Sequence, residues 1–287
     1  MEPPHIVVTA IAAAKTFLIQ TTPLAKPLMR ATTHIYLNNM KHILYLLFVC
    51  VLFVSCAKKQ NQLIIEGDFT HAPQAKIKLA VITEDDLVII DSTTLKDGHF
   101  QFTVHGNNDM EKARLSTPML YQILLSYNNT LTTLAQGGDH IVIKADAKNT
   151  SGTYRVSGSK EAELMGQLDS ALAAFVQPTN ALYSVYEDNI ENDSIRESIE
   201  NDYIKLLKNH KDFLTDFIRK HPDNLASYVA FYQSYNRRSF FSEEQDFELL
   251  QSITKSLLNK YPNHPYLKKM KQRVEVLELI KQRKEQQ

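Results

Sequence analysis

The residues best suited to covalent chemistry in this sequence are its two cysteines, Cys50 and Cys56. A thiolate attacks disulfides and peroxides, so a thiol redox enzyme needs at least one reactive cysteine. Both cysteines lie in or directly after an apolar run, and no cysteine follows Cys56. We therefore expect residues 57–287 to contain no catalytic thiol. Two cysteines are also too few for a disulfide scaffold or a cysteine-rich zinc module.

Histidine and hydroxyl side chains offer no clear alternative chemistry. His99 and His105 lie six residues apart in one strand pattern, about 20 Å at ~3.3 Å per residue, so they cannot share a metal ion. His140 could approach either one, but isolated and half-buried histidines are the favoured interpretation. Asp91 and Ser92 are neighbours in a strand pattern, so their side chains point to opposite faces and cannot act together as an acid and a nucleophile.

Acidic residues and known motifs likewise predict no enzyme activity, cofactor or metal. The dense acidic stretch 187–193 lacks the glycine and the ligand spacing of an EF-hand, which favours a solvated loop over a calcium site. The sequence has no Gly-x-x-x-x-Gly-Lys loop, no Gly-x-Ser-x-Gly elbow and no His-Glu-x-x-His helix. Its 32 basic and 32 acidic residues balance, which gives no electrostatic basis for binding nucleic acid.

The strongest local signal surrounds Cys56. Met40-Lys41-His42 precedes an uninterrupted apolar run at 43–54, then Ser55-Cys56, and then a polar segment at 57–61. The run fits the ~7–15 residues of a signal-peptide core and is shorter than the ~20 that span a bilayer. A small residue before cysteine resembles the bacterial lipoprotein signal, which implies cleavage before Cys56 and attachment of lipid to it. A short membrane anchor or a buried strand is the alternative.

This resemblance divides the N-terminal region into three parts. Residues 1–39 are interpreted as a mis-assigned upstream extension, 40–55 as the signal peptide and 56–61 as a lipidated linker. Removing residues 1–56 removes four basic residues and one acidic residue, which leaves 28 basic and 31 acidic side chains. Ala57, rather than aspartate, follows the cysteine, and by resemblance to the known sorting rule this implies the outer membrane, on its periplasmic or its outer face.

Residues 62–158 have the pattern of a β-rich domain. Short alternating or apolar runs are separated by turn residues, and Lys96-Asp97-Gly98 is typical of a hairpin turn. Strands are predicted at 63–69, 76–82, 87–93, 99–105, 113–117, 121–127, 131–135, 140–145 and 153–157, with 87–93 buried. This spacing predicts an antiparallel β-sandwich or open barrel.

The order of the turns in this domain resembles a known family. The elements are a strand ending at Gly67, Ile90-Asp91-Ser92-Thr93, the hairpin around Asp97-Gly98, Gly137-Gly138-Asp139 and Val156-Ser157-Gly158-Ser159. Together they resemble the domain of unknown function 4369 (DUF4369) of Gram-negative lipoproteins. In that family the domain often precedes a helical stretch and a thioredoxin-like peroxiredoxin (AhpC/TSA) domain. The cysteines of such a catalytic domain have no counterpart after Cys56.

Residues 159–287 have the 3.6-residue periodicity of an α-helical domain. A first helix from Lys160 is expected to be interrupted at Pro178, and a long amphipathic helix is expected at 195–218. Further helices are predicted at 225–235, at 242–260 with Ser242 as its capping residue, and at 266–281. The segments 220–224 and 260–264 are alike, which indicates either stacked helical hairpins or, as the favoured interpretation, ordinary helix ends at proline.

One connector in the helical domain has the composition of a contact surface. Arg237, Arg238, Phe240 and Phe241 precede the predicted cap at Ser242, where a connector is normally exposed. Arginine and aromatic residues are enriched at protein interfaces. We expect these four residues to contact a partner, and replacement of both phenylalanines by alanine to leave folding largely intact.

Taken together, the sequence predicts an α+β protein with an N-terminal β-sandwich or open barrel followed by an α-helical domain. The predicted function is that of a non-enzymatic, lipid-anchored envelope protein that binds or organises a protein partner. The alternative is an accessory or degenerate member of a thiol-disulfide oxidoreductase system, as the family resemblance implies. A glycan-binding module is a third possibility, but the chain has no tryptophan to form the usual stacking platform.

Overall fold

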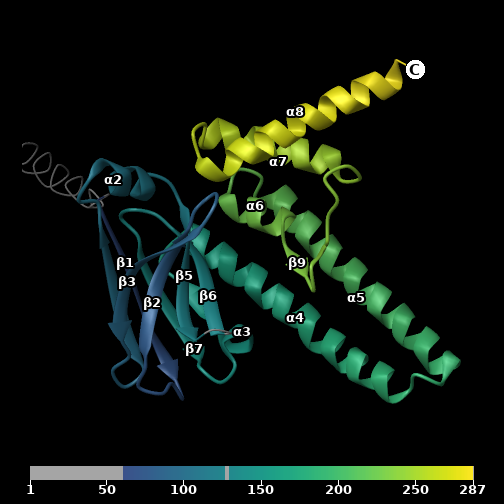
Figure 1. Cartoon of the computed structure of the whole chain (residues 1–287), viewed down its shortest axis with the longest axis horizontal. Helices are drawn as coiled ribbons and strands as arrows, with labels where there is room; N and C mark the ends of the chain where they lie inside the picture. The colour runs from purple at the N-terminus through teal and green to yellow at the C-terminus, as the bar shows by residue number, and fades with distance from the viewer. Residues whose placement is uncertain (1–60, 127–128, 287) are drawn as a thin grey trace, which may run out of the picture. The chain divides into compact units, whose positions relative to one another are not determined.

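The structure is a computed structural model that describes residues 61–126 and 129–286. The predicted upstream extension, the signal peptide and Cys56 lie outside the described residues. The remainder of the chain, from Lys58 onward, forms one compact unit. It has β-strands in its N-terminal part and mainly helices in its C-terminal part, which confirms the predicted α+β class (Figure 1).

The β part consists of two four-stranded sheets. One sheet has the strand order β4-β1-β7-β8 and the other has the order β3-β2-β5-β6. The strands are β1 (Gln62–Thr70), β2 (Lys76–Ile82), β3 (Leu87–Thr94), β4 (His99–His105), β5 (Met119–Ser126), β6 (Asn129–Ala135), β7 (His140–Asp146) and β8 (Arg155–Ser157). The prediction allowed a β-sandwich or an open barrel. The strands form two separate open sheets, as in a sandwich.

Alternation along the strands places one face of each sheet in a shared core. In β1, Leu63, Ile65 and Phe69 are buried, and Ile77 and Leu79 of β2 belong to the same hydrophobic cluster. Within the first sheet, β1 pairs with β4 in antiparallel and with β7 in parallel orientation. The parallel pair is the exception in an otherwise antiparallel architecture.

Two local predictions for the β part are wrong. Residues 113–117 do not form a strand, because they fall in or just after helix α2 (Asp109–Leu115), whose N-terminus is capped by the Asn108 side chain. Strand β3 exists but is not buried: Leu87, Val88 and Ile89 are 40–52% exposed. The reason is its position, since β3 lies at the edge of its sheet and only β2 pairs with it.

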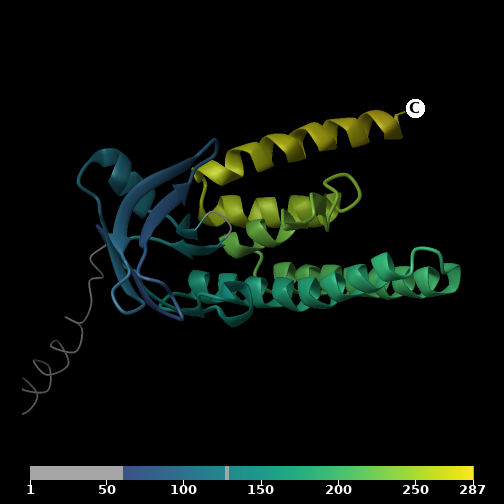
Figure 2. The same ribbon diagram turned by 60° about the horizontal axis from the view of Figure 1, so that its bottom comes forward.

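The helical part begins with two long helices that run side by side, α4 (Lys160–Asp188) and α5 (Asp193–Lys220) (Figure 2). The predicted interruption at Pro178 is wrong, because α4 continues through it. A proline inside a helix costs about 3 kcal/mol. Phe175 and Thr179, on either side of it, are buried, so tertiary packing offsets this cost.

Three shorter helices and a small hairpin complete this part: α6 (Leu225–Phe231), β9 (Ser234–Tyr235), β10 (Arg238–Ser239), α7 (Phe247–Lys260) and α8 (Pro265–Glu285). Helix α7 begins five residues later than predicted. The Ser242 hydroxyl does accept a hydrogen bond from the Gln245 amide, but this bond closes a turn that precedes the helix. The long helix α5 is confirmed.

The two turns that looked alike in the sequence are also alike in structure. His221 ends α5 and Tyr261 ends α7, both with φ of −131°. Asn224 and His264 then cap the next helices with their side chains. Each turn therefore ends one helix and begins the next. This geometry fits ordinary helix ends at proline and also fits stacked helical hairpins.

Helix α8 is tied to the β part at its first turn. The Tyr266 hydroxyl donates a hydrogen bond to the Ile82 carbonyl and accepts one from the Leu120 amide, 3.1 Å away. His264 Nε2 donates to the Pro118 carbonyl at 2.8 Å. Burial lowers the pKa of His264, which favours the neutral ring that this geometry requires. The helical and β parts are therefore joined by buried, specific contacts.

Candidate binding groove

A tight hairpin lies between α6 and α7 and carries two of the four predicted contact residues, Arg237 and Arg238. Tyr235 pairs with Arg238, and Asn236 and Arg237 form the two-residue turn with φ of 48° and 63°. Positive φ at both central positions is the geometry of a type I′ turn. Asparagine tolerates this conformation, whereas an arginine there is strained by about 1 kcal/mol. The connector is thus an ordered hairpin rather than a loose link.

The prediction that Phe241 is an exposed contact residue is wrong. Its side chain is only 5% exposed and stacks on Phe231 with ring centroids 5.2 Å apart. Lys211 Nζ lies 5.1 Å from the Phe241 ring centroid. After the hairpin the chain turns back toward the helices, and the side chain of Phe241 points into the core.

Phe240 is half-buried and also belongs to the packing. Its ring meets Phe175 edge-on at 5.3 Å and lies 4.5 Å from the His210 ring. His210 Nε2 is 2.7 Å from Gln233 Oε1, and burial lowers the pKa of this histidine. The aromatic cluster of Phe175, His210 and Phe240 therefore fixes the hairpin against α4 and α5.

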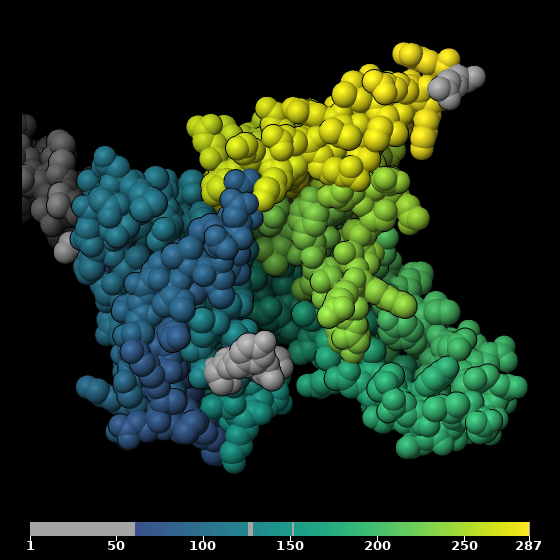
Figure 3. Space-filling view, in the orientation of Figure 1, coloured from purple at the N-terminus to yellow at the C-terminus, as the bar shows by residue number. Residues whose placement is uncertain are grey.

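A groove of about 760 Å³ is lined by residues of the hairpin and of the two long helices. Figure 3 shows the hairpin projecting beside the surface of α4 and α5. We call it the tyrosine groove, and it is lined by Thr179, Asn180, Leu182, Tyr183, Tyr186, Ile199, Glu200, Tyr203, Tyr235, Asn236 and Arg238. Four of these residues are tyrosines, and Tyr183 is 61% exposed. The Tyr235 hydroxyl donates to Asn180 Oδ1 at 2.8 Å, which holds that ring in place.

A smaller, basic groove of about 380 Å³ adjoins the first and shares Tyr203, Tyr235 and Arg238 with it. Lys208 and Lys211 also line it, but each is paired with an aspartate, Asp212 and Asp246 respectively. Arg238 is exposed, and no described residue forms a hydrogen bond or ion pair with its side chain. Arg238 therefore leaves an available positive charge between the two grooves.

Of the predicted contact residues, only Arg238 lines the tyrosine groove. Arg237 is exposed but lines neither groove, the half-buried Phe240 lines the basic groove, and Phe241 packs inward. Tyr183, Tyr186 and Tyr203 also line the tyrosine groove and were not predicted from the sequence. Their helical spacing carries a weak signal, since Tyr183 and Tyr186 lie three residues apart and hence on the same side of α4.

The residues considered for catalysis are not brought together. His99 pairs with Asp68 and His140 pairs with Glu66, and both histidine side chains are 55% exposed. The Asp91 carboxylate accepts a bond from the Ser92 backbone amide. Across residues 61–126 and 129–286, no group of three or more His, Cys, Asp or Glu residues is arranged to hold a metal ion.

Comparison with known proteins identifies the β part. The family model "Domain of unknown function (DUF4369)" matches residues 63–165, which confirms the resemblance inferred from the order of turns. No curated protein and no solved structure matches the chain. Among the helices that the structure describes, none is both long and apolar enough to cross a membrane.

Proposed function

We propose that this protein is a non-enzymatic, lipid-anchored protein of the cell envelope that binds a segment of a partner protein in the tyrosine groove. The observation that carries the proposal is the composition of the groove, which is lined by four tyrosines and by an arginine that no described residue pairs with. Tyrosine and arginine dominate the binding energy of protein interfaces because they combine large contact area with directional hydrogen bonds.

The groove is lined by one basic side chain, Arg238, and one acidic side chain, Glu200, and the unpaired guanidinium favours an acidic side chain in the part of the segment that meets Arg238. Arg238 offers a guanidinium to a carboxylate, and a paired arginine and carboxylate form two parallel hydrogen bonds. The tyrosine rings offer flat apolar surface to the neighbouring side chains of the same segment. Rigid anchoring of Tyr235 through Asn180 lowers the entropy lost on binding.

Replacing Arg238 by glutamate is expected to weaken partner binding roughly 30-fold, which corresponds to about 2 kcal/mol. Tyr183→Ala should act in the same direction, because it removes an exposed ring of the groove. The measurement is quantitative pull-down from solubilised envelopes, followed by titration of the identified partner.

Arg237→Gly is the matched control for this experiment. It removes a positive charge from the same turn, but from a side chain that lines neither groove, and glycine suits the positive φ of that position. The proposal is supported if the Arg237→Gly variant binds the partner as the wild type does and the Arg238→Glu variant binds it much more weakly. Equal binding by all variants, measured with the identified partner, would exclude the groove as the binding surface.

The anchoring part of the proposal rests on the sequence around Cys56. We expect Cys56→Ala to prevent processing and lipid attachment, because the lipid is joined to the sulfur of this cysteine and the wild-type protein depends on its acyl chains for membrane affinity. The test is fractionation of cells grown with a labelled fatty-acid analogue. An unlabelled wild-type protein would contradict lipid attachment and leave the groove to be tested separately.

A further inference from the structure

A third cleft lies where α4 packs against the β part, and of the residues that line the tyrosine groove it shares only Asn180. It has a volume of about 340 Å³, which is within the range of small-molecule sites. Leu131 of β6 and Leu172 and Val176 of α4 supply apolar walls. Gln177 and Asn180 add side-chain amides. The cleft therefore combines an apolar body with a few polar groups.

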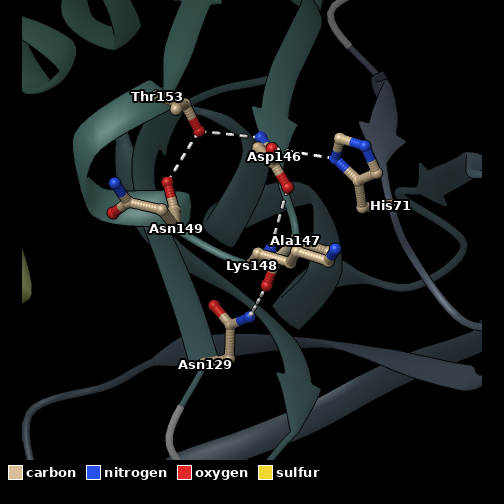
Figure 4. A network of polar contacts seen from close by, with 7 residues as sticks. All are labelled: His71, Asn129, Asp146, Ala147, Lys148, Asn149 and Thr153. Atoms are coloured by element: carbon tan, nitrogen blue, oxygen red, sulfur yellow. Dashed lines mark hydrogen bonds and ion pairs between the residues drawn. The ribbon is translucent and has the colours of Figure 1, made fainter.

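One wall of the cleft is held rigidly by the network drawn in Figure 4. The Asp146 carboxylate accepts a hydrogen bond from the Lys148 amide and pairs with His71, and these contacts lower the pKa of Asp146. The Thr153 hydroxyl accepts from the Asp146 amide and donates to the carbonyl of Asn149, which itself lines the cleft. Asn149 and the neighbouring Tyr154 are thereby positioned before any ligand arrives.

Asp169 of α4 lies in this cleft without a partner. Its carboxylate is partly buried, and no described residue gives it a hydrogen bond or an ion pair. Burial raises its pKa to about 7, so near neutral pH about half of the molecules carry a charge that nothing in the described chain compensates. An uncompensated carboxylate lowers stability, and such a group is typical of a binding site.

Tyr154 places a buried polar group beside the same cleft. Its side chain is 2% exposed, and its hydroxyl interacts with the Thr133 hydroxyl but forms no well-aligned hydrogen bond with any described residue. Burial, with the Asp169 carboxylate as a further cause, raises the pKa of Tyr154. The buried Thr133 hydroxyl likewise forms no well-aligned hydrogen bond with a described residue, so this pair of hydroxyls is poorly satisfied. A buried hydroxyl usually has a partner, so a ligand that supplies one would satisfy the site.

We propose that this cleft binds a small organic ammonium ion, with Asp169 as its counter-ion, the apolar walls around its hydrocarbon part and the Tyr154 hydroxyl as an additional hydrogen-bond partner. An ammonium group matches a lone carboxylate in charge and can donate to hydroxyl and amide oxygens. A divalent metal fits less well, because it would need several charged ligands and the cleft supplies one. This inference does not depend on the function proposed for the tyrosine groove.

The test uses butylammonium chloride as the probe, with 1-butanol and sodium butyrate as neutral and anionic counterparts of equal length. We expect butylammonium to raise the melting temperature of the purified protein in a saturable manner at pH 8, and neither counterpart to match it. Asp169→Asn should weaken apparent binding roughly tenfold or more, because it removes the charge and keeps the shape. Binding to the wild type should also weaken at pH 5.5, where Asp169 is protonated.

Two further variants complete the design. Asp188→Asn removes an exposed carboxylate from the same helix and should bind as the wild type does. Ala173→Leu keeps Asp169 but fills part of the cleft, so it should lose binding and serves as the test if Asp169→Asn does not fold. An equal response in Asp169→Asn, an equal response to 1-butanol, or no saturable response to butylammonium would overturn the proposal.

Discussion

Replacing Phe241 by alanine should lower the free energy of unfolding by about 3–5 kcal/mol. The ring is almost completely buried and stacks on Phe231 with an angle of only 6° between the planes. Truncation removes this contact and leaves a cavity between the hairpin and α6 that the rigid surroundings fill only in part. Urea denaturation followed by circular dichroism measures the change.

The neighbouring residues give graded controls for this prediction. Phe240 is half-buried, so Phe240→Ala should cost less, about 1–3 kcal/mol. Arg238→Ala, at an exposed side chain, should change stability by no more than ~0.5 kcal/mol. If Phe241→Ala were as stable as Arg238→Ala, the ring would have to be exposed and the packing described for the hairpin would be wrong.

Removing the hydroxyl of Tyr266 should destabilise the contact between α8 and the β part by about 2–4 kcal/mol. Tyr266→Phe keeps the ring, but it leaves the Ile82 carbonyl and the Leu120 amide without their partner. Each buried backbone group that loses its hydrogen bond costs about 1–3 kcal/mol. We expect a lower urea midpoint and faster amide hydrogen exchange at residue 120.

Tyr228→Phe is the matched control, because the Tyr228 ring stacks on Tyr266 at 5.7 Å and its hydroxyl is in no hydrogen bond among the described residues. This change should alter stability by no more than ~0.5 kcal/mol. A Tyr266→Phe protein with unchanged midpoint and unchanged exchange at Leu120 would show that the hydroxyl does not join the two parts.

The β part was predictable wherever a local pattern determines the structure. The alternation at β4 and the turn at Asp97-Gly98 are such patterns, and both are confirmed. The prediction for 113–117 is wrong because the Asn108 side chain caps a helix that begins at Asp109 and runs into that segment. Whether β3 is buried depends on its position at the edge or in the middle of the sheet. The residues of a single strand do not determine that position.

The candidate groove was only partly predictable, for a similar reason. The arginines and phenylalanines of the segment around Arg238 predicted a contact surface there, and Arg238 lines the tyrosine groove. The direction of the Phe241 side chain depends on the turn at Asn236-Arg237, and arginine is an unusual residue for its positive φ. The tyrosines of α4 and α5 come together only because Pro178 does not end α4, and burial around that proline decides this point.

The pairing of β1 constrains the order in which this chain can fold during synthesis or export. β1 lies between β4 and β7, and its parallel neighbour β7 follows it by about 75 residues, as in the pair Ile65 and Ile141. Gly67 lets the two backbones approach closely, because a Cβ there would lie 2.2 Å from the Ile143 carbonyl oxygen. A chain that emerges from its N-terminal end must therefore keep its first strand unpaired on one edge until β7 appears. During that interval a chaperone that shields extended apolar segments would have its target in β1.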